Sequence, residues 1–255
     1  MGSMGEKKDN SAMEAIAMAA DDRVFSTTDL IDEPLDEVIA DLSRGLSEED
    51  AAFIAEAATE LSTRLKPKRF AHSISVARTM RRFSELYDLD LSQCVRSGLI
   101  HDWDKCYVGD AAHERVRELG IELPWDFERM EALLHSITGA KALSIRFPQL
   151  EPEILQAVER HTSGAVDMQP LDMALYVADM LEPTRAYEKL VPLRELIGEL
   201  PLPELFGECF RATVEHLVAK RRFFHPETAN IWNAWVGRNA LREWLRRQQE
   251  EQAGR

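Results

Sequence analysis

Cysteine is scarce in this chain of 255 residues, which has only Cys94, Cys106 and Cys209 and no Cys-x-x-Cys spacing. An odd, scattered set argues against a disulfide framework and against a cysteine zinc site. Long hydrophobic runs are missing as well, since no stretch approaches the ~20 apolar residues of a membrane span. The first residues lack the apolar core of a signal peptide. We therefore expect a reduced, cytoplasmic protein.

Positive charge is in deficit, and the formal net charge is −14. Such a chain repels nucleic acid polymers and anionic membranes, so we expect neither as a partner. A small phosphorylated ligand is not excluded, because a few Arg or Lys side chains and a metal can set the local potential. The charge balance thus argues against polymer binding and leaves nucleotide binding open.

Strand signals are also lacking: the chain has no alternating apolar pattern, no hairpin dipeptide and no Gly-rich phosphate loop after a strand. We expect an all-α fold, a helical bundle with an N-terminal extension and a C-terminal amphipathic helix. The predicted divisions are a poorly ordered or loosely helical extension at 1–46, a hydrolase domain at 47–236 and a charged helical tail at 237–255.

Apolar periodicity, capping residues and Pro or Gly breaks predict the individual helices. Ser47 is the expected N-cap of the first clear helix, Ser92 opens a later one, and Gly120 follows the end of another. The expected ranges are 47–65, 68–87, a helix from Ser92 to about 100, 111–119, a helix starting at Pro124, an apolar run to 147, 152–161, 171–181, 188–199, 203–221 and 227–250.

The pair His101-Asp102 ends an apolar helical run, and Asp179 is the one acid in the apolar run from Met173 to Met180. An ionised carboxylate in such a place needs a partner. Imidazole and carboxylate together suit a divalent transition metal. One arrangement accounts for these residues together: His72, His101, Asp102 and Asp179 form a metal site.

Simpler alternatives stay open for each of these residues. Asp179 forms an ion pair with Arg185 or Arg160 in one alternative, and His72 is a surface residue. His161 then acts as a C-cap, and His135 is a partly exposed helix residue.

The order of these residues resembles the HD superfamily of metal-dependent phosphohydrolases, and in particular its YqeK-type branch, the symmetrical bis(5'-nucleosyl)-tetraphosphatases. The resemblance spans residues 69 to 228. The matching pieces are Arg69-Phe70-Ala71-His72, His101-Asp102-Trp103-Asp104-Lys105, Leu134-His135-Ser136-Ile137-Thr138-Gly139-Ala140, Arg160-His161-Thr162-Ser163-Gly164, Ala178-Asp179-Met180-Leu181-Glu182-Pro183-Thr184-Arg185 and His225-Pro226-Glu227-Thr228.

The resemblance implies hydrolysis of diadenosine tetraphosphate to two ADP at one or two divalent ions, with iron or a similar metal expected. The implied metal ligands are His72, His101, Asp102 and Asp179. His135 and His161 would hold a second metal or touch phosphate. Asp102 and Lys105 are the implied catalytic residues. Substrate binding would fall to Arg69, Lys105, Thr162 and Arg185, with His225 helping to close the nucleotide site.

Two features depart from the family. Asp104 stands where a small residue is usual; a carboxylate there would repel phosphate, bind a cation or pair with Lys105. The segment ahead of Arg69 is longer than the usual lead-in. Two other functions compete with the first: an HD phosphohydrolase acting on a mono- or triphosphate or an alarmone, and a non-catalytic nucleotide-binding protein or helical interaction module. A homodimer through the Trp-bearing C-terminal helix is a further expectation.

Overall fold

The structure is a computed structural model that describes residues 27–123 and 127–238. Within these ranges the chain is helical, and the only β-type pairing is an isolated bridge between Ile197 and Leu200. The all-α prediction is confirmed. No helix in this described part has the length and apolar character needed to cross a lipid bilayer. The elements are α2 (Thr27–Ile31), α3 (Leu35–Ser43), α4 (Glu48–Arg64), α5 (Pro67–Leu86), α6 (Leu91–Ile100), α7 (Asp110–Glu118), η1 (Phe127–Met130), α8 (Glu131–Arg146), α9 (Pro152–Arg160), α10 (Pro170–Leu181), η2 (Glu188–Leu190), α11 (Val191–Arg194), α12 (Leu202–Ala219), α13 (Thr228–Trp232) and the π-helical η3 (Asn233–Gly237).

Among the described elements, helices α5 and α6 pack against each other most extensively. Pro67 starts α5 at its first turn, where a missing N–H costs nothing. Asp90 caps α6 by accepting a hydrogen bond from the backbone N–H of Gln93 at 2.8 Å. The two helices approach at Gly98, where an added Cβ would lie 2.8 Å from Cα of Ala77. This glycine therefore sets how near the last turns of α6 can come to the middle of α5.

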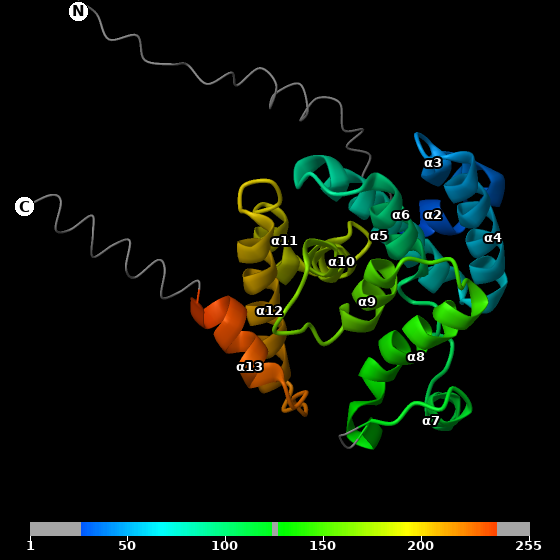
Figure 1. Cartoon of the computed structure of the whole chain (residues 1–255). Helices are drawn as coiled ribbons and strands as arrows, with labels where there is room; N and C mark the ends of the chain where they lie inside the picture. The colour runs from blue at the N-terminus through cyan, green and yellow to red at the C-terminus, as the bar shows by residue number, and fades with distance from the viewer. Residues whose placement is uncertain (1–26, 124–126, 239–255) are drawn as a thin grey trace, which may run out of the picture.

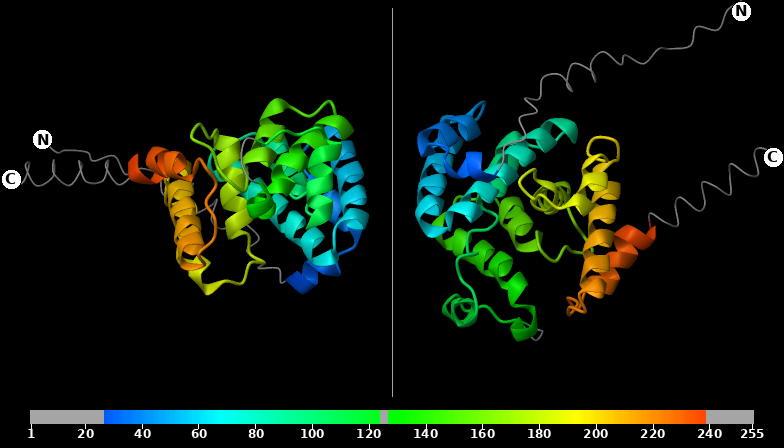
Figure 2. Two further views of the ribbon diagram at one scale, coloured as in Figure 1. Left: turned by 90° about the horizontal axis from the view of Figure 1, so that it is seen from below. Right: turned by 180° about the vertical axis from the view of Figure 1, so that it is seen from behind.

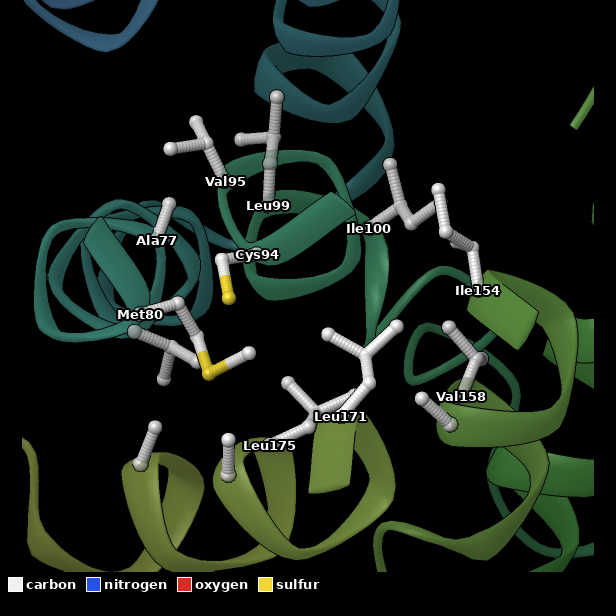
Figure 3. Close-up of a cluster of buried hydrophobic side chains, with 14 of the residues drawn as sticks. Ala77, Met80, Cys94, Val95, Leu99, Ile100, Ile154, Val158, Leu171 and Leu175 are labelled. Atoms are coloured by element: carbon white, nitrogen blue, oxygen red, sulfur yellow. The ribbon is translucent and has the colours of Figure 1, made fainter. Parts of the chain in front are cut away.

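Four helices enclose the central apolar core. Figure 3 shows Met80 of α5, Cys94 of α6, Val158 of α9 and Leu171 of α10 facing a common interior. All four side chains are buried. Helix α10 is apolar on nearly all sides and lies between α9 and α12 (Figure 1). The core thus fixes the positions of α5, α6 and α10 relative to one another at the end where the polar residues lie.

The segment before residue 47 belongs to the same core. Leu30, Val38 and Leu42 are buried in the cluster that contains α5 and α6. Arg78 of α5 bonds Glu33 at 2.6 Å and Asp41 at 2.8 Å, which fixes the segment on the bundle. The predicted division at residue 47 therefore has no counterpart in the packing, although residues 1–26 lie outside the described part of the chain.

The C-terminal helices cover the opposite side of the molecule from α3 and α4 in both views of Figure 2. Trp235 donates its indole N–H to the carbonyl of Ala165 at 2.9 Å. Gly164, with φ of +69°, turns the chain beside Phe206 and Phe210 in a backbone conformation that side chains other than glycine rarely adopt. The loop after α9 is thus anchored on α12 and η3.

Several predicted boundaries need correction. Asp90, not Ser92, caps α6, and the predicted helix at 188–199 is broken. Pro192 lies in the first turn of the separate short helix α11, and Gly198, with φ of +82°, follows it. The helix expected from Pro124 is instead η1 followed by one continuous α8, with residues 124–126 outside the described part. Of the helix expected at 227–250, α13 and η3 are described, while residues 239–255 lie outside the described part.

Candidate metal and phosphate site

Four histidines meet at one end of the core, and we refer to them as the histidine cluster: His72, His101, His135 and His161. They come from α5, the end of α6, α8 and the end of α9, and all four are buried. Their ring centroids form a continuous row, with His101 lying 5.2 Å from His72 and 5.1 Å from His161. His135 lies 5.1 Å from His161. The surface and partly exposed alternatives for His72 and His135 are therefore wrong.

Asp102 lies at the centre of this row. Its Oδ1 is 3.2 Å from Nε2 of His135 and 3.8 Å from Nε2 of His161. Its Oδ2 is 3.7 Å from Nε2 of His101 and 3.3 Å from Nη1 of Arg69. The side chain is buried, so its charge acts with little screening from solvent. One carboxylate thus lies within 4 Å of three imidazole rings and a guanidinium group.

Asp179 of α10 closes the other end of the cluster. Its Oδ1 lies 2.9 Å from Nε2 of His72, 2.6 Å from Nη2 of Arg185 and 3.7 Å from Nε2 of His101. The ion pair with Arg185, which the sequence left open, is therefore present together with the contact to His72. Arg160 pairs instead with Asp172, at 3.0 Å.

The donor atoms of the cluster fit a metal ion. Nδ1 of His101 donates to the carbonyl of Gly98 at 2.8 Å, and Nδ1 of His161 donates to the carbonyl of Val158 at 2.7 Å. A carbonyl only accepts, so each Nδ1 carries the proton and each Nε2 presents a lone pair. Nε2 of His101 is buried with no hydrogen-bond partner among the described residues. An orphaned, buried lone pair beside carboxylates is what a cation would satisfy.

Two groups of residues have ligand atoms close enough together to share one ion. The first is His72, His101 and Asp102, and the second is Asp102, His135 and His161. Asp102 belongs to both groups. The geometry accommodates the predicted ligands and places Asp179 beside the first group.

The charges in the cluster perturb its protonation. Burial alone would lower the pKa of His72, but the hydrogen bonds to Asp179 and Glu182 raise it to about 9. Burial lowers the pKa of His135 and that of His161 to about 4 each. Burial opposes ionisation of Asp102 and Asp179, yet the neighbouring imidazoles and Arg185 hold both pKa values well below the usual range. Two fixed carboxylates and two neutral imidazoles are a donor set suited to a divalent cation.

Glu182 orients His72 by accepting a hydrogen bond from its Nδ1, a role that the sequence did not reveal. Its Oε1 accepts from Nδ1 of His72 at 2.9 Å, and its Oε2 accepts from the backbone N–H of Thr184 at 2.7 Å. The side chain is fully buried. A carboxylate bonded to Nδ1 fixes the tautomer that turns Nε2 toward a metal. Its partner is 110 residues away in the chain, so no local pattern could have revealed it.

We expect Glu182→Gln to weaken metal binding by about 10- to 100-fold, because the amide cannot orient His72 as the carboxylate does. Competition with a chelator measures this affinity. Glu188→Gln is the control, since Glu188 is an exposed glutamate of η2. An unchanged affinity in Glu182→Gln, with a lowered melting temperature, would show that Glu182 serves only the turn at Thr184.

Cationic side chains border the carboxylates. Lys105 lies 3.8 Å from Oδ1 of Asp102, with its Nζ 3.0 Å from Nε2 of His135. A cavity of about 390 Å³ opens beside His72 and is lined by Lys68, Arg69, Glu182, Arg185 and Tyr187 among others; we call it the cationic cavity. A second cavity of about 520 Å³, near the first turns of α4 and α6, contains none of the predicted site residues.

Two other predicted site residues, Thr162 and His225, lie in different parts of the structure. Thr162 follows His161 directly and shares a hydrogen bond of 2.9 Å with Ser136. His225 lies on the loop between α12 and α13, where its Nδ1 accepts from the backbone N–H of Glu227 at 3.3 Å. Its part in closing the site stays a prediction.

Asp104 has none of the three roles expected for it. Its Oδ1 accepts from Arg64 at 2.5 Å and its Oδ2 from Arg115 at 3.0 Å, with no exposure to solvent. Both oxygens are thus neutralised by arginines of α4 and α7. The carboxylate braces the turn that carries Asp102 and Lys105.

Comparisons with known proteins agree with this geometry. Residues 69–184 match the sequence model of the family described as HD domain, and this range contains the histidine cluster, Asp102 and Asp179. A protein of Staphylococcus aureus named "Bis(5'-nucleosyl)-tetraphosphatase, symmetrical" is 27% identical over 173 residues, which are 67% of this chain and 88% of the relative. A protein of the same name from Bacillus subtilis is 26% identical over 183 residues, 71% of this chain and 96% of the relative.

A solved structure is also similar. It is described as a predicted HD superfamily hydrolase involved in NAD metabolism from Clostridium acetobutylicum, and it superposes with a TM-score of 0.67 at 28% identity. The match covers 72% of this chain and 96% of the other.

Proposed function

Because the chain belongs to the HD-domain family of metal-dependent phosphohydrolases, we propose that it cleaves diadenosine tetraphosphate symmetrically to two ADP. The observation that carries the proposal is the buried Asp102 between two groups of metal-binding side chains, next to a cavity lined by arginine and lysine. The names of the two relatives supply the substrate class.

We propose that His72, His101, Asp102 and Asp179 hold a divalent metal, with iron as the expected ion. Where a second ion is bound, His135 and His161 would hold it together with Asp102. When bound, the metal would supply Lewis acidity, which would lower the pKa of a coordinated water from about 16 toward about 7 and offset phosphoryl charge. The first group and the neighbouring Asp179 together offer two imidazoles and two carboxylates, a mixed N and O set that suits iron.

The protein's own side chains bind and orient the polyphosphate. Arg185 and Arg69 present guanidinium forks that match two phosphate oxygens, whereas Lys105 acts as a point charge. Lys105 is held against Asp102, so its ammonium stays beside the reacting phosphate and stabilises the charge on the equatorial oxygens. Asp102 accepts a hydrogen bond from the attacking water and orients it. Thr162 offers a hydroxyl to a phosphate oxygen.

The Arg185→Ala variant is expected to keep the metal but to bind the substrate more weakly. A lost charged hydrogen bond is worth about 1.5–3 kcal/mol, so KM should rise roughly 10- to 150-fold. Steady-state kinetics and metal analysis of the same preparation measure both effects. Arg211→Ala is the control, because its guanidinium pairs with Glu208 on the surface of α12. Loss of metal in Arg185→Ala would place Arg185 in the metal site rather than at the phosphates.

The deciding experiment is chromatography of the nucleotides released from diadenosine tetraphosphate by anaerobically purified, iron-loaded protein. ADP as the only product is the expected result. AMP with ATP would mean attack at another phosphate and would refute symmetrical cleavage. No turnover in protein that holds metal would favour another phosphorylated nucleotide. Nucleotide binding that does not depend on metal would favour a non-catalytic binding protein.

Two further expectations remain predictions. The homodimer through the C-terminal helix is tested by light scattering of the purified full chain. The cytoplasmic location is tested by fractionation of cells that express it.

A further inference from the structure

Tyr187 is a large aromatic side chain left in solvent at the rim of the cationic cavity. It follows Arg185 by two residues and is 65% exposed. Its backbone N–H is bonded to the carbonyl of Arg185 at 2.8 Å, and its carbonyl accepts from Leu190 at 2.9 Å, so both sides of the residue are anchored. In the described part of the chain, no aromatic ring or guanidinium covers the tyrosine ring. The backbone that carries the ring is thus held in place, while the face of the ring stays open.

The cavity beneath Tyr187 is positively charged, although the chain as a whole carries −14. Lys68, Arg69 and Arg185 line it, and Glu182 is the one acid among the residues that do. The oxygens of that acid already accept hydrogen bonds from His72 and Thr184. The cavity therefore attracts an anion.

His72 connects this cavity to the metal ligands. It lines the cavity, and it also belongs to the group formed with His101 and Asp102. An anion held by Arg69 and Arg185 consequently extends from the metal ligands toward Tyr187. The volume of about 390 Å³ lies in the range of small-ligand sites.

A ligand that fits this arrangement has phosphates at one end and a flat aromatic system at the other. We propose that Tyr187 stacks on the nucleobase of a nucleotide whose phosphates are bound by Arg69 and Arg185. This inference rests on the proposed function, and it assigns one nucleoside half of the substrate to the cationic cavity. Stacking on an aromatic ring tolerates any base, because every base has a π-face.

The test is calorimetric titration of the metal-loaded protein with ADP, and separately with inorganic tripolyphosphate, which lacks a base. Tyr187→Ala should weaken ADP binding roughly 5- to 150-fold, the usual range for a lost base stack. Its affinity for tripolyphosphate should stay within about 2-fold. Tyr187→Phe keeps the ring and should bind ADP as the unaltered protein does. In kinetics, Tyr187→Ala should raise KM and leave kcat unchanged.

Ile145→Ala is the matched control, because Ile145 is 63% exposed on α8 and does not line the cavity. Equal ADP affinity in Tyr187→Ala and the unaltered protein would overturn the proposal. Equal losses for ADP and tripolyphosphate would overturn it too, since the tyrosine would then act on the phosphate end. Failure of the proposed function looks different: ADP binding would depend on Tyr187 while diadenosine tetraphosphate stayed intact.

Discussion

Asp102→Ala is expected to release the bound metal and abolish turnover together. Asp102 is the one residue common to both groups of metal-binding side chains, so its loss weakens each of them. The change also leaves Arg69 and Lys105 without their carboxylate, at distances of 3.3 and 3.8 Å in the unaltered protein. Positive charge then remains where the cation should bind. We expect a fall in kcat/KM of roughly 10³-fold or more, because the lowering of the pKa of water depends on the metal.

Metal analysis and turnover of diadenosine tetraphosphate, measured on one preparation, check this prediction. Asp102→Asn adds a second test, since it keeps the shape of the side chain and removes only the charge. Asp36→Asn is the control because Asp36 is an exposed carboxylate of α3. Circular dichroism shows whether the fold persists. If Asp102→Ala retained both metal and turnover, the assignment of the site would be wrong.

The sequence predicted best those features that depend on neighbouring residues. Ser47 is the N-cap of α4, as expected, because its Oγ accepts from the backbone N–H of Asp50 three residues later. Gly120 follows the end of α7, also as expected, because its φ of +63° is a left-handed conformation that favours glycine after a helix. Asp90 and Ser92 are both good capping residues, and nothing in the local sequence chooses between them.

The features that the sequence missed depend on partners far along the chain. Asp104 is neutralised by Arg64, 40 residues earlier, and by Arg115 from another helix. Glu182 orients His72 across 110 residues. The convergence of His72, His101, Asp102 and Asp179 also involves distant residues. It was nevertheless predicted, because buried polar groups need partners and because the order of the motifs resembles a known family.

Gly98→Ala is expected to damage the fold and the metal site at once. The new methyl group would lie 2.8 Å from Cα and 3.1 Å from the backbone nitrogen of Ala77, which cannot rotate away. Helix α6 must therefore move off α5, at a cost of about 1–3 kcal/mol in the free energy of unfolding. The movement also shifts the carbonyl of Gly98, which accepts from Nδ1 of His101 at 2.8 Å. We expect metal affinity to fall with stability.

Gly139→Ala separates this steric cost from helix propensity. Gly139 lies in α8, and an added Cβ there would meet its nearest neighbours, the backbone nitrogen of Asp104 and Cβ of Trp103, at 3.6 and 3.7 Å, which are ordinary contacts. Both substitutions gain up to about 1 kcal/mol of helix propensity, so only the close approach differs. Urea unfolding should show Gly139→Ala equal to or more stable than the unaltered protein, with full metal affinity, and Gly98→Ala less stable. Equal stabilities of the two variants would mean that α5 and α6 can separate without cost, and the helix pair would then not set the distance between His72 and His101.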